Sequence, residues 1–363
     1  MRRKELDWIR NLAVLMLFLY HTSVIFAYSG DWYVRSGQNS TLCTVFILST
    51  FPWYMPLLFF ISGAATKFSL ESREENQYFR ERLNRLLVPF LFGLLVIVPP
   101  QTYLARLWRG QNPGSYFEHL KYFFTHVTDF TGYDGSLAPG HLWFILFLFV
   151  ISLLGMPLIK LFRTPKGISA MLILKKKLTG RNVLWWLLLI FFICEIFPEI
   201  AGQSIVIDLT LFLLGYIVYS DEEYLKAIDK YKRSFLIITL VLIPIGLLYF
   251  YNAAELKLGL LSEIAQALIK DAIMSSAIVS IIGYGREYLN RGDSVLKYLN
   301  KACFPVYILH QTVVVITAYF VLHMNLIIYV SIILIVVVSV IITFTAYEIC
   351  RRIKFLRVLL GMK

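Results

Sequence analysis

Residues 12–26 read Leu12-Ala-Val-Leu-Met-Leu-Phe-Leu-Tyr20-His21-Thr-Ser-Val-Ile-Phe26 and place a histidine inside the first hydrophobic segment of the chain. An ionisable side chain at membrane depth is costly, and it usually faces a bundle interior or a wet cavity where it has a function. Arg10 lies eleven residues before His21, so on an α-helix the two side chains fall within roughly 20° of one face and about 16 Å apart along the axis. A cation near the membrane rim and a base near its middle favour a site for an anionic substrate with a reactive tail.

The composition is that of a membrane protein. Of the 363 residues, 58% are hydrophobic and only 16% are charged, and the mean hydropathy is +0.68. A water-soluble domain of this length could not bury so much apolar surface, so we expect an all-α protein that crosses the bilayer several times. The formal net charge of +12 would suggest a nucleic-acid partner in a soluble protein. Here the positive-inside rule accounts for it, and no nucleic-acid partner is expected.

Ten apolar stretches are long enough to cross the hydrocarbon core. They cover residues 7–28, 42–66, 86–105, 141–162, 183–200, 204–220, 234–252, 258–283, 303–322 and 325–348. The fifth and sixth stretches are short and predict a tight pair. The eighth carries Lys270 and Asp271, and each is expected to pair with a group on another helix, because adjacent residues of a helix do not face each other. We interpret residues 1–363 as a single integral-membrane domain.

The lysine and arginine residues set the orientation. With the N-terminus in the cytoplasm, 28 of the 35 fall in cytoplasmic segments and 5 in outer segments. The outer ones are Arg35, Arg106, Arg109, Lys121 and Lys257. A bias of this size predicts that both termini are cytoplasmic. The one long outer connection, residues 106–140, is expected to cover the outer mouth of the bundle, because long connections are more often functional than short ones.

Two arginines precede the third span. Arg82 and Arg85 lie three residues apart in Arg80-Glu-Arg82-Leu-Asn-Arg85-Leu-Leu-Val-Pro89, so they share one face of an α-helix. Guanidinium groups bind phosphate oxygens in bidentate fashion, and the pair therefore suits a diphosphate at the cytoplasmic surface. Contact with lipid headgroups explains the same pair equally well.

Two further histidines lie in or beside apolar stretches. His310 and Gln311 lie in the ninth span, about 10 Å from the cytoplasmic face. His141 opens the fourth span, two residues before Trp143. Two intramembrane histidines are difficult to explain as structural residues, whereas His141 and Trp143 also fit an ordinary membrane interface. The sequence shows neither a phosphate-binding glycine loop nor a metal-ligand cluster, so no metal site is expected.

Taken together, these motifs resemble acyltransferase family 3, a family of integral-membrane acyltransferases. The resemblance covers nearly the whole chain and rests on the patterns Arg10-x10-His21, Arg82-x-x-Arg85 and Tyr307-Ile-Leu-His310. The opening of the fourth span, His141-Leu-Trp-Phe144, and the compact ten-span length are most similar to the branch that contains the glucan biosynthesis protein C.

The resemblance implies an acyl-CoA from the cytoplasm as donor, carrying an acetyl or succinyl group, and no permanently bound cofactor. Arg10, Arg82 and Arg85 would hold the phosphates of CoA at the cytoplasmic rim. The pantetheine arm would then reach inward to His21. The acceptor would be a hydroxyl of an extracytoplasmic glycan, which places the protein in the inner cell membrane.

Each site residue then has an expected role. His21 acts as general base on the acceptor hydroxyl, although a mechanism in which His21 is itself acylated stays open. His310, with Gln311, stabilises the developing oxyanion or positions the acyl carbonyl, and His141 and Trp143 line the acceptor entrance. The alternative class is a transporter or flippase for a glycan or lipid-linked sugar, which the absence of a visible inverted repeat disfavours. The sequence leaves the oligomeric state open.

Overall fold

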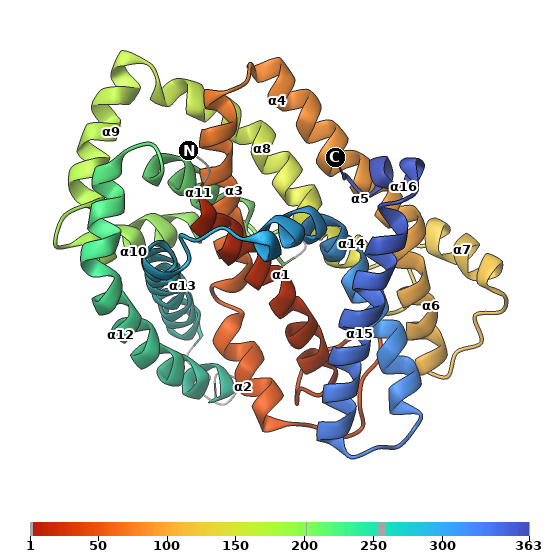
Figure 1. The fold of residues 1–363 in the computed structure, drawn as a ribbon. Helices are drawn as coiled ribbons and strands as arrows, with labels where there is room; N and C mark the ends of the chain where they lie inside the picture. Colours follow the sequence, from red (N-terminus) through yellow and green to blue (C-terminus); the bar gives the residue numbers. More distant parts are fainter. Residues whose placement is uncertain (1–2, 201, 253–258, 363) are drawn as a thin grey trace. The chain divides into compact units, whose positions relative to one another are not determined.

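The computed structural model describes residues 3–200, 202–252 and 259–362 (Figure 1). Within these ranges every regular element is a helix, and one isolated bridge joins Ile200 and Gln203. Apolar runs with few charges form helices because a helix satisfies its backbone hydrogen bonds internally, as the bilayer requires. The all-helical class expected from the sequence is confirmed.

The chain forms two compact units. The first unit comprises Met1–Arg10, Leu48–Phe79 and Val150–Asp293, and the second comprises Asn11–Ile47, Arg80–Phe149 and Ser294–Lys363. Four helices contribute residues to both units: α1 (Lys4–Ile25), α2 (Thr41–Thr50), α4 (Glu75–Arg82) and α8 (Trp143–Phe162). The single domain expected over residues 1–363 stays a prediction.

The first unit is built on two closely packed helix pairs. α3 (Tyr54–Glu71) packs on α11 (Ile205–Val218), and α12 (Glu222–Asn252) packs on α13 (Leu260–Tyr288). α10 (Val183–Cys194) lies against α13 and against α9 (Pro165–Leu178). A largely apolar cavity of about 70 Å³ lies among α10, α11, α12 and α13, and none of the residues lining it was singled out from the sequence.

Two glycines bring the backbones of α3 and α11 into contact. A Cβ atom built on Gly63 would overlap the carbonyl oxygen of Phe212, and one built on Gly215 would overlap that of Phe60. Small residues allow membrane helices to approach this closely, and van der Waals packing then stabilises the pair. The α3–α11 contact therefore depends on the absence of side chains at both positions.

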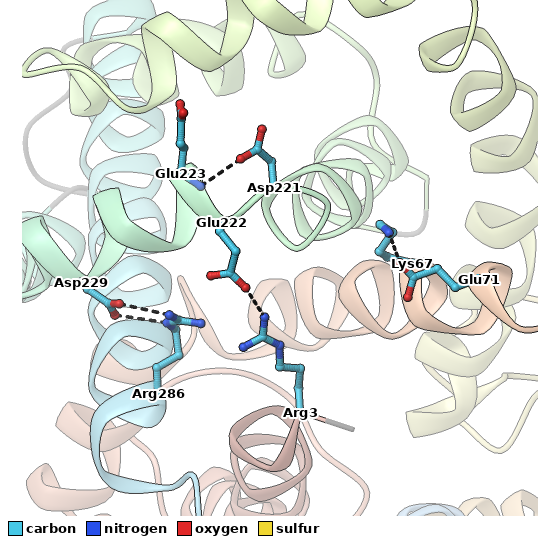
Figure 2. A network of polar contacts seen from close by, with 8 residues as sticks. All are labelled: Arg3, Lys67, Glu71, Asp221, Glu222, Glu223, Asp229 and Arg286. Atoms are coloured by element: carbon cyan, nitrogen blue, oxygen red, sulfur yellow. Dashed lines mark hydrogen bonds and ion pairs between the residues drawn. The ribbon is translucent and has the colours of Figure 1, made fainter. Parts of the chain in front are cut away.

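Ion pairs join the charged helix ends of the first unit (Figure 2). Arg286 of α13 donates to both carboxylate oxygens of Asp229 on α12, at 3.2 and 3.1 Å. Arg3 binds Glu222, at the start of α12, at 2.6 Å. Partly exposed pairs of this kind contribute about 0–1 kcal/mol each, so they orient the helix ends more than they stabilise the fold.

The two charged neighbours on α13 have different surroundings. Lys270 Nζ lies 2.6 Å from Glu195 Oε1, at the end of α10, as expected for a pair between helices. Asp271 is fully buried, and neither carboxylate oxygen has a hydrogen-bond partner among the described residues. The partner expected for Asp271 is therefore not found within the described part of the chain. Adjacent helical residues differ by about 100°, and the face on which Asp271 lies offers its carboxylate no donor within the described ranges.

The second unit is built around α14 (Ser294–Leu322), which is buried along most of its length. It packs on α15 (Ile328–Cys350), which lies beside it in blue in Figure 1, and on α6 (Val98–Trp108). The shorter elements of this unit are η1 (Leu83–Leu87), α5 (Val88–Phe92), η2 (Gly93–Ile97), α7 (Tyr116–Thr125), η3 (Gly140–Leu142) and α16 (Lys354–Leu359).

Two π-helical turns, η1 and η2, interrupt the third predicted span. Pro89 follows η1 and Pro99 follows η2, and proline has no N–H with which to continue α-helical hydrogen bonding. A neighbouring helix supplies a donor in this region, because Thr312 Oγ1 donates to the carbonyl oxygen of Ile97 at 2.7 Å. Ser and Thr side chains often satisfy backbone groups in this way in membrane helices, and here the bond joins α14 to the end of η2.

Eight helical segments among the described residues are long and apolar enough to cross a membrane. They are Lys4–Ile25, Thr41–Glu71, Glu75–Trp108, Gly140–Phe162, Glu222–Tyr249, Leu260–Tyr288, Ser294–Leu322 and Ile328–Cys350. The fifth and sixth predicted spans form the shorter helices α10, with 12 residues, and α11, with 14, and each rises only about 20 Å. The structure supports a multi-pass membrane protein, and the count of ten spans stays a prediction.

The orientation of the chain also stays a prediction. Three of the basic residues counted for it, Arg2, Lys257 and Lys363, lie outside the described residues.

The surface of α15 fits a lipid environment, since Ile333 is 63% exposed and Ile341 is 59% exposed.

Candidate functional site

His21 lies on the buried face of α1, one turn before that helix ends at Ile25. Val14, Leu17 and Phe18, one and two turns earlier, are also buried, as residues on one helix face should be. The His21 side chain itself is only 9% exposed. The ring therefore faces the interior of the second unit rather than the lipid side of α1.

Three histidines meet in the second unit. The ring centroid of His310, on α14, lies 5.2 Å from that of His21 and 5.1 Å from that of His141, on η3. His310 is fully buried and His141 is 6% exposed, and the ring of Phe18 packs edge-on against His310 at 5.8 Å. We call His21, His310 and His141 the histidine row. The structure thus brings together three residues that the sequence singled out in separate helices.

Backbone carbonyl groups fix the tautomers of two rings in the row. His310 Nδ1 lies 2.6 Å from the carbonyl oxygen of Tyr307, and His141 Nε2 lies 2.8 Å from that of Ile308. A carbonyl oxygen only accepts, so each of these nitrogens carries the hydrogen. The other nitrogens, His310 Nε2 and His141 Nδ1, therefore hold lone pairs in the neutral rings. Neither has a hydrogen-bond partner among the described residues, and the same is true of His21 Nδ1.

A hydrogen bond and a glycine stabilise the turn that contains His141. Tyr307 Oη donates to the carbonyl oxygen of His141. The preceding residue, Gly140, has φ +52°, a conformation that glycine adopts readily and other residues rarely do. A Cβ atom built there would lie 3.2 Å from Gln101 Nε2 and 3.2 Å from Tyr33 Oη. Gly140 therefore allows both the sharp turn and the approach of two polar groups to the residue that precedes His141.

A pair of glutamines lies beside the row. Gln311 Nε2 donates to Gln101 Oε1 at 2.9 Å, from α14 to α6. Both side chains are buried, with exposures of 2% and 0%. Gln101 Nε2 has no hydrogen-bond partner among the described residues. The sequence singled out Gln311 but not Gln101, which carries the unused donor.

An aromatic wall covers His21. The indole of Trp32, in the connection after α1, stacks on the His21 ring with centroids 5.2 Å apart and planes inclined by 17°. Tyr33 and Tyr133 pack against Trp32 at 5.3 and 5.9 Å. Trp32 is 9% exposed, and its Nε1 has no hydrogen-bond partner among the described residues. Faces of stacked aromatic rings are surfaces on which sugar rings can also pack.

Arg109 holds this wall in place. One guanidinium nitrogen donates to Asp31 Oδ1 at 2.8 Å and to the carbonyl oxygen of Trp32 at 3.3 Å, and the other donates to the carbonyl oxygen of Tyr133. Arg109 therefore links the connection after α1 to the long connection over residues 106–140. That long connection was expected to cover the outer mouth of the bundle, and within this unit it lies against the aromatic wall beside His21.

His119 anchors α7 in the same long connection. It is fully buried, and its Nε2 lies 2.9 Å from Thr102 Oγ1 on α6. Burial, with a smaller contribution from the Arg106 charge, lowers the pKa of His119 from 6.5 to about 4. The neutral ring is thus favoured in the folded state, and its contribution to stability is present above about pH 6.5 and is lost as the pH falls toward 4.

We therefore expect α7 to open at mildly acidic pH. Amide hydrogen exchange over residues 116–126, corrected for the intrinsic pH dependence, should lose protection between pH 6.5 and 4 in the wild type. In His119→Gln, which keeps a side-chain hydrogen-bonding group for Thr102 and cannot be protonated, protection should change little over that range. An equal loss in both proteins would show that another group controls the opening.

The remaining predicted site residues lie near helix starts and ends. Trp143 is half-buried and packs edge-on against Phe144 and Phe147 of its own helix, at 6.3 and 5.4 Å. It follows His141 by two residues, or about 200° around the helix axis, so it extends from a different side of α8. Its expected place at the acceptor entrance stays a prediction.

The arginines expected to bind phosphate lie in both units. Arg10 pairs with Asp7, one turn earlier on α1, at 3.0 Å in the first unit. Arg82 ends α4 and Arg85 lies in η1, where Arg85 Nε is 3.1 Å from Glu81 Oε1. The π-helical turn replaces the regular α-helical spacing assumed for Arg82 and Arg85, and such turns are frequent at functional sites. A joint role for the three arginines stays a prediction.

The residues that sequence reasoning missed share one property: each acts through contacts made by distant parts of the chain. They are Asp31, Trp32, Tyr33, Gln101, Arg109 and Tyr133. One signal was available, since Gln101 is an amide that follows two prolines inside a predicted span, and polar groups at that depth are expensive. The Trp32–Tyr33 pair gave no comparable signal, because aromatic residues are common at membrane interfaces.

Comparison with known proteins gives one match. The model of a family described as an acyltransferase domain matches residues 3–346. No curated protein and no solved structure matches the chain.

Proposed function

This chain belongs to the acyltransferase domain family, and from that premise we propose that it transfers an acetyl or succinyl group from acyl-CoA to a hydroxyl of an extracytoplasmic glycan. The family and the apolar helices support a multi-pass membrane acyltransferase. The donor, the acyl group, the glycan acceptor and the inner membrane are the proposed part. The histidine row is the observation that carries the proposal, because it brings three buried imidazoles together in the second unit, each with one nitrogen that has no hydrogen-bond partner among the described residues.

The chemistry follows from the positions of the lone pairs. An imidazole of the row, His21 in our proposal, takes the proton of the acceptor hydroxyl while the hydroxyl oxygen bonds to the thioester carbonyl carbon. The tetrahedral intermediate then collapses, the carbon–sulfur bond breaks, and the CoA thiolate takes up the proton. The product is an ester, and no oxidant or metal takes part. His310, whose N–H is already bonded to Tyr307, serves in this scheme as a second proton acceptor rather than as an oxyanion donor.

The donor would approach from the side of Arg82 and Arg85. Each guanidinium offers a planar pair of donors to a phosphate oxygen pair, and both side chains are partly exposed. The Glu81 carboxylate that contacts Arg85 would be displaced from it or shared when the diphosphate binds. Arg10 is proposed as a third phosphate ligand on the strength of its spacing from His21.

Replacing Arg82 and Arg85 with alanine is expected to weaken acyl-CoA binding by more than about tenfold, since each lost charge-assisted hydrogen bond contributes about 1.5–3 kcal/mol. The turnover number at saturating donor should change less. Arg80→Ala, an exposed arginine of the same helix, is the matched control and should leave binding unchanged. Equal affinity in the double variant and in Arg80→Ala would remove the phosphate-binding role.

The proposed acceptor class is tested in cells. Envelope glycans from cells with and without this chain are released, purified and compared by mass spectrometry. The proposal expects O-acetyl or O-succinyl groups only when the chain is present, and their loss after mild alkaline treatment. Identical glycan profiles in both cells would contradict the glycan acceptor, while acyl-CoA turnover by the purified protein would still support an acyltransferase.

A further inference from the structure

The proposed acyl transfer needs a hydrogen-bond donor that His310, His141 and Gln311 do not supply. A negative charge develops on the carbonyl oxygen of the thioester as the tetrahedral intermediate forms, and preorganised donors stabilise it. In the neutral rings of His310 and His141 the only N–H groups are bonded to the carbonyls of Tyr307 and Ile308. Gln311 donates to Gln101. The N–H groups of His310, His141 and Gln311 that are described above are therefore already hydrogen-bonded within the protein and are not available to the substrate.

Two other buried donors beside the row are unused. The indole Nε1 of Trp32 and the amide Nε2 of Gln101 have no hydrogen-bond partner among the described residues, and both side chains are nine-tenths or more buried. An indole N–H can only donate, and so can an amide NH₂. Burying a donor without a partner costs free energy, which an incoming acceptor oxygen would recover.

Both donors adjoin the row. The Trp32 ring stacks on His21 at 5.2 Å. Gln101 Nε2 lies beside Gly140, the residue before His141, where a built Cβ atom would be 3.2 Å from it. The same built atom would be 3.2 Å from Tyr33 Oη, and Tyr33 is the neighbour of Trp32 in the chain. A series of neighbouring residues, Trp32, Tyr33, Gly140 and Gln101, thus connects the two side chains that carry the donors.

We infer that Trp32 Nε1 and Gln101 Nε2 form the binding site for the acyl carbonyl oxygen, first of the thioester and then of the tetrahedral oxyanion. This inference rests on the proposed acyl transfer and adds the donor set that it lacks. The site then separates two functions: Trp32 and Gln101 donate to the oxygen that becomes negative, and the lone pairs of the histidine row accept the proton. Glycine at position 140 leaves the space in which Gln101 Nε2 lies beside the residue before His141.

The test uses variants that remove each donor and keep the shape. Trp32→Phe keeps an aromatic face toward His21, and Gln101→Met keeps the length of the side chain. Each is expected to lower kcat by about 10²-fold or more, as the loss of one oxyanion donor does, with a smaller change in the KM for acyl-CoA. Trp108→Phe and Gln38→Met remove the same chemical groups away from the row and should keep the wild-type kcat.

A spectroscopic measurement separates this role from a structural one. Acyl-CoA labelled with ¹³C at the carbonyl is bound to the intact protein without acceptor, and the carbonyl stretch is recorded by infrared difference spectroscopy. In the wild type the band should shift to lower wavenumber than in water-free solvent, and each variant should reverse part of the shift. Replacement of Trp32 by β-(3-benzothienyl)alanine, in which a sulfur atom takes the place of the indole N–H, should give the same reversal if Trp32→Phe fails to fold.

The outcomes are distinguishable. Wild-type protein that neither binds acyl-CoA nor turns it over would contradict the proposed function. Wild-type activity with kcat and the carbonyl band unchanged in the Trp32 and Gln101 variants would overturn the inference and leave the proposed function intact. Reduced kcat together with a band that moves back toward the free-carbonyl position would support the inference.

Discussion

Alanine at position 21 is expected to lower kcat for acyl transfer by about 10³-fold, within the 10²–10⁴-fold range typical of a lost general base. His21 lies at the end of the row that faces the aromatic wall, with Nδ1 free of any hydrogen bond among the described residues. The variant should still insert and fold, because alanine is a good helix former and α1 remains apolar. Acyl-CoA binding should be nearly unchanged. The measurement is steady-state transfer of a labelled acyl group in proteoliposomes.

The control for this variant is another histidine of the second unit. His323→Ala removes an exposed imidazole whose Nδ1 contacts the carbonyl oxygen of Tyr319, and it should keep wild-type kcat. The same assay distinguishes the two roles of His21. A labelled acyl group bound to the protein after donor is added without acceptor, and absent from His21→Ala, would favour an acylated histidine over a general base. Full activity in a stably folded His21→Ala protein would reject both roles.

Alanine at Gly63 is expected to cause the largest loss of stability, about 3 kcal/mol or more, because overpacking with no room to relax exceeds the usual range of 1–3 kcal/mol. The added Cβ atom would overlap the backbone carbonyl oxygen of Phe212, and a backbone atom cannot rotate away as a flexible side chain can. α3 and α11 must then separate along their whole contact. Thermal unfolding in detergent, followed by the accessibility of buried cysteines, measures the loss.

Gly37→Ala is the matched control for this prediction, because nothing lies within 4 Å of a Cβ atom built there and its φ is not positive. Gly215→Ala, on the facing helix, should behave like Gly63→Ala, since its Cβ atom would overlap the carbonyl oxygen of Phe60. Melting temperatures of Gly63→Ala and Gly215→Ala equal to that of Gly37→Ala would mean that α3 and α11 do not pack as described.

The helical class and most of the long helices could be predicted from the sequence, because hydropathy and the 3.6-residue period depend on local composition. The count of spans could not be settled in the same way. The fifth predicted stretch, 183–200, is apolar throughout most of its length, but α10 ends at Cys194, and the Ile200–Gln203 bridge lies between α10 and α11. The sixth stretch forms α11, which has only 14 residues. The π-helical turns before Pro89 and Pro99 were also missed, since their register depends on partners such as Thr312.

The residues of the candidate site, too, could be predicted only in part from the sequence. His21 and His310 were recognised because ionisable groups are rare at membrane depth. His141 was expected to line the acceptor entrance, and its role stays a prediction. It lies buried beside His310, where the turn at Gly140 and the bond from Tyr307 hold it. Trp32 and Gln101 adjoin the row only after the chain has folded, and no local pattern predicts which aromatic or amide side chain will arrive there.

The most direct test places donor and acceptor on opposite sides of one membrane. Protein is reconstituted in sealed vesicles, acyl-CoA labelled in the acyl group is supplied on the side of the chain termini, and a glycan with free hydroxyls is supplied on the other side. We predict that the label appears as an O-acyl ester on the glycan with wild-type protein, and not with His21→Ala. A folded wild-type protein that leaves acyl-CoA unhydrolysed and the glycan unlabelled, with donor on either side, would contradict the account.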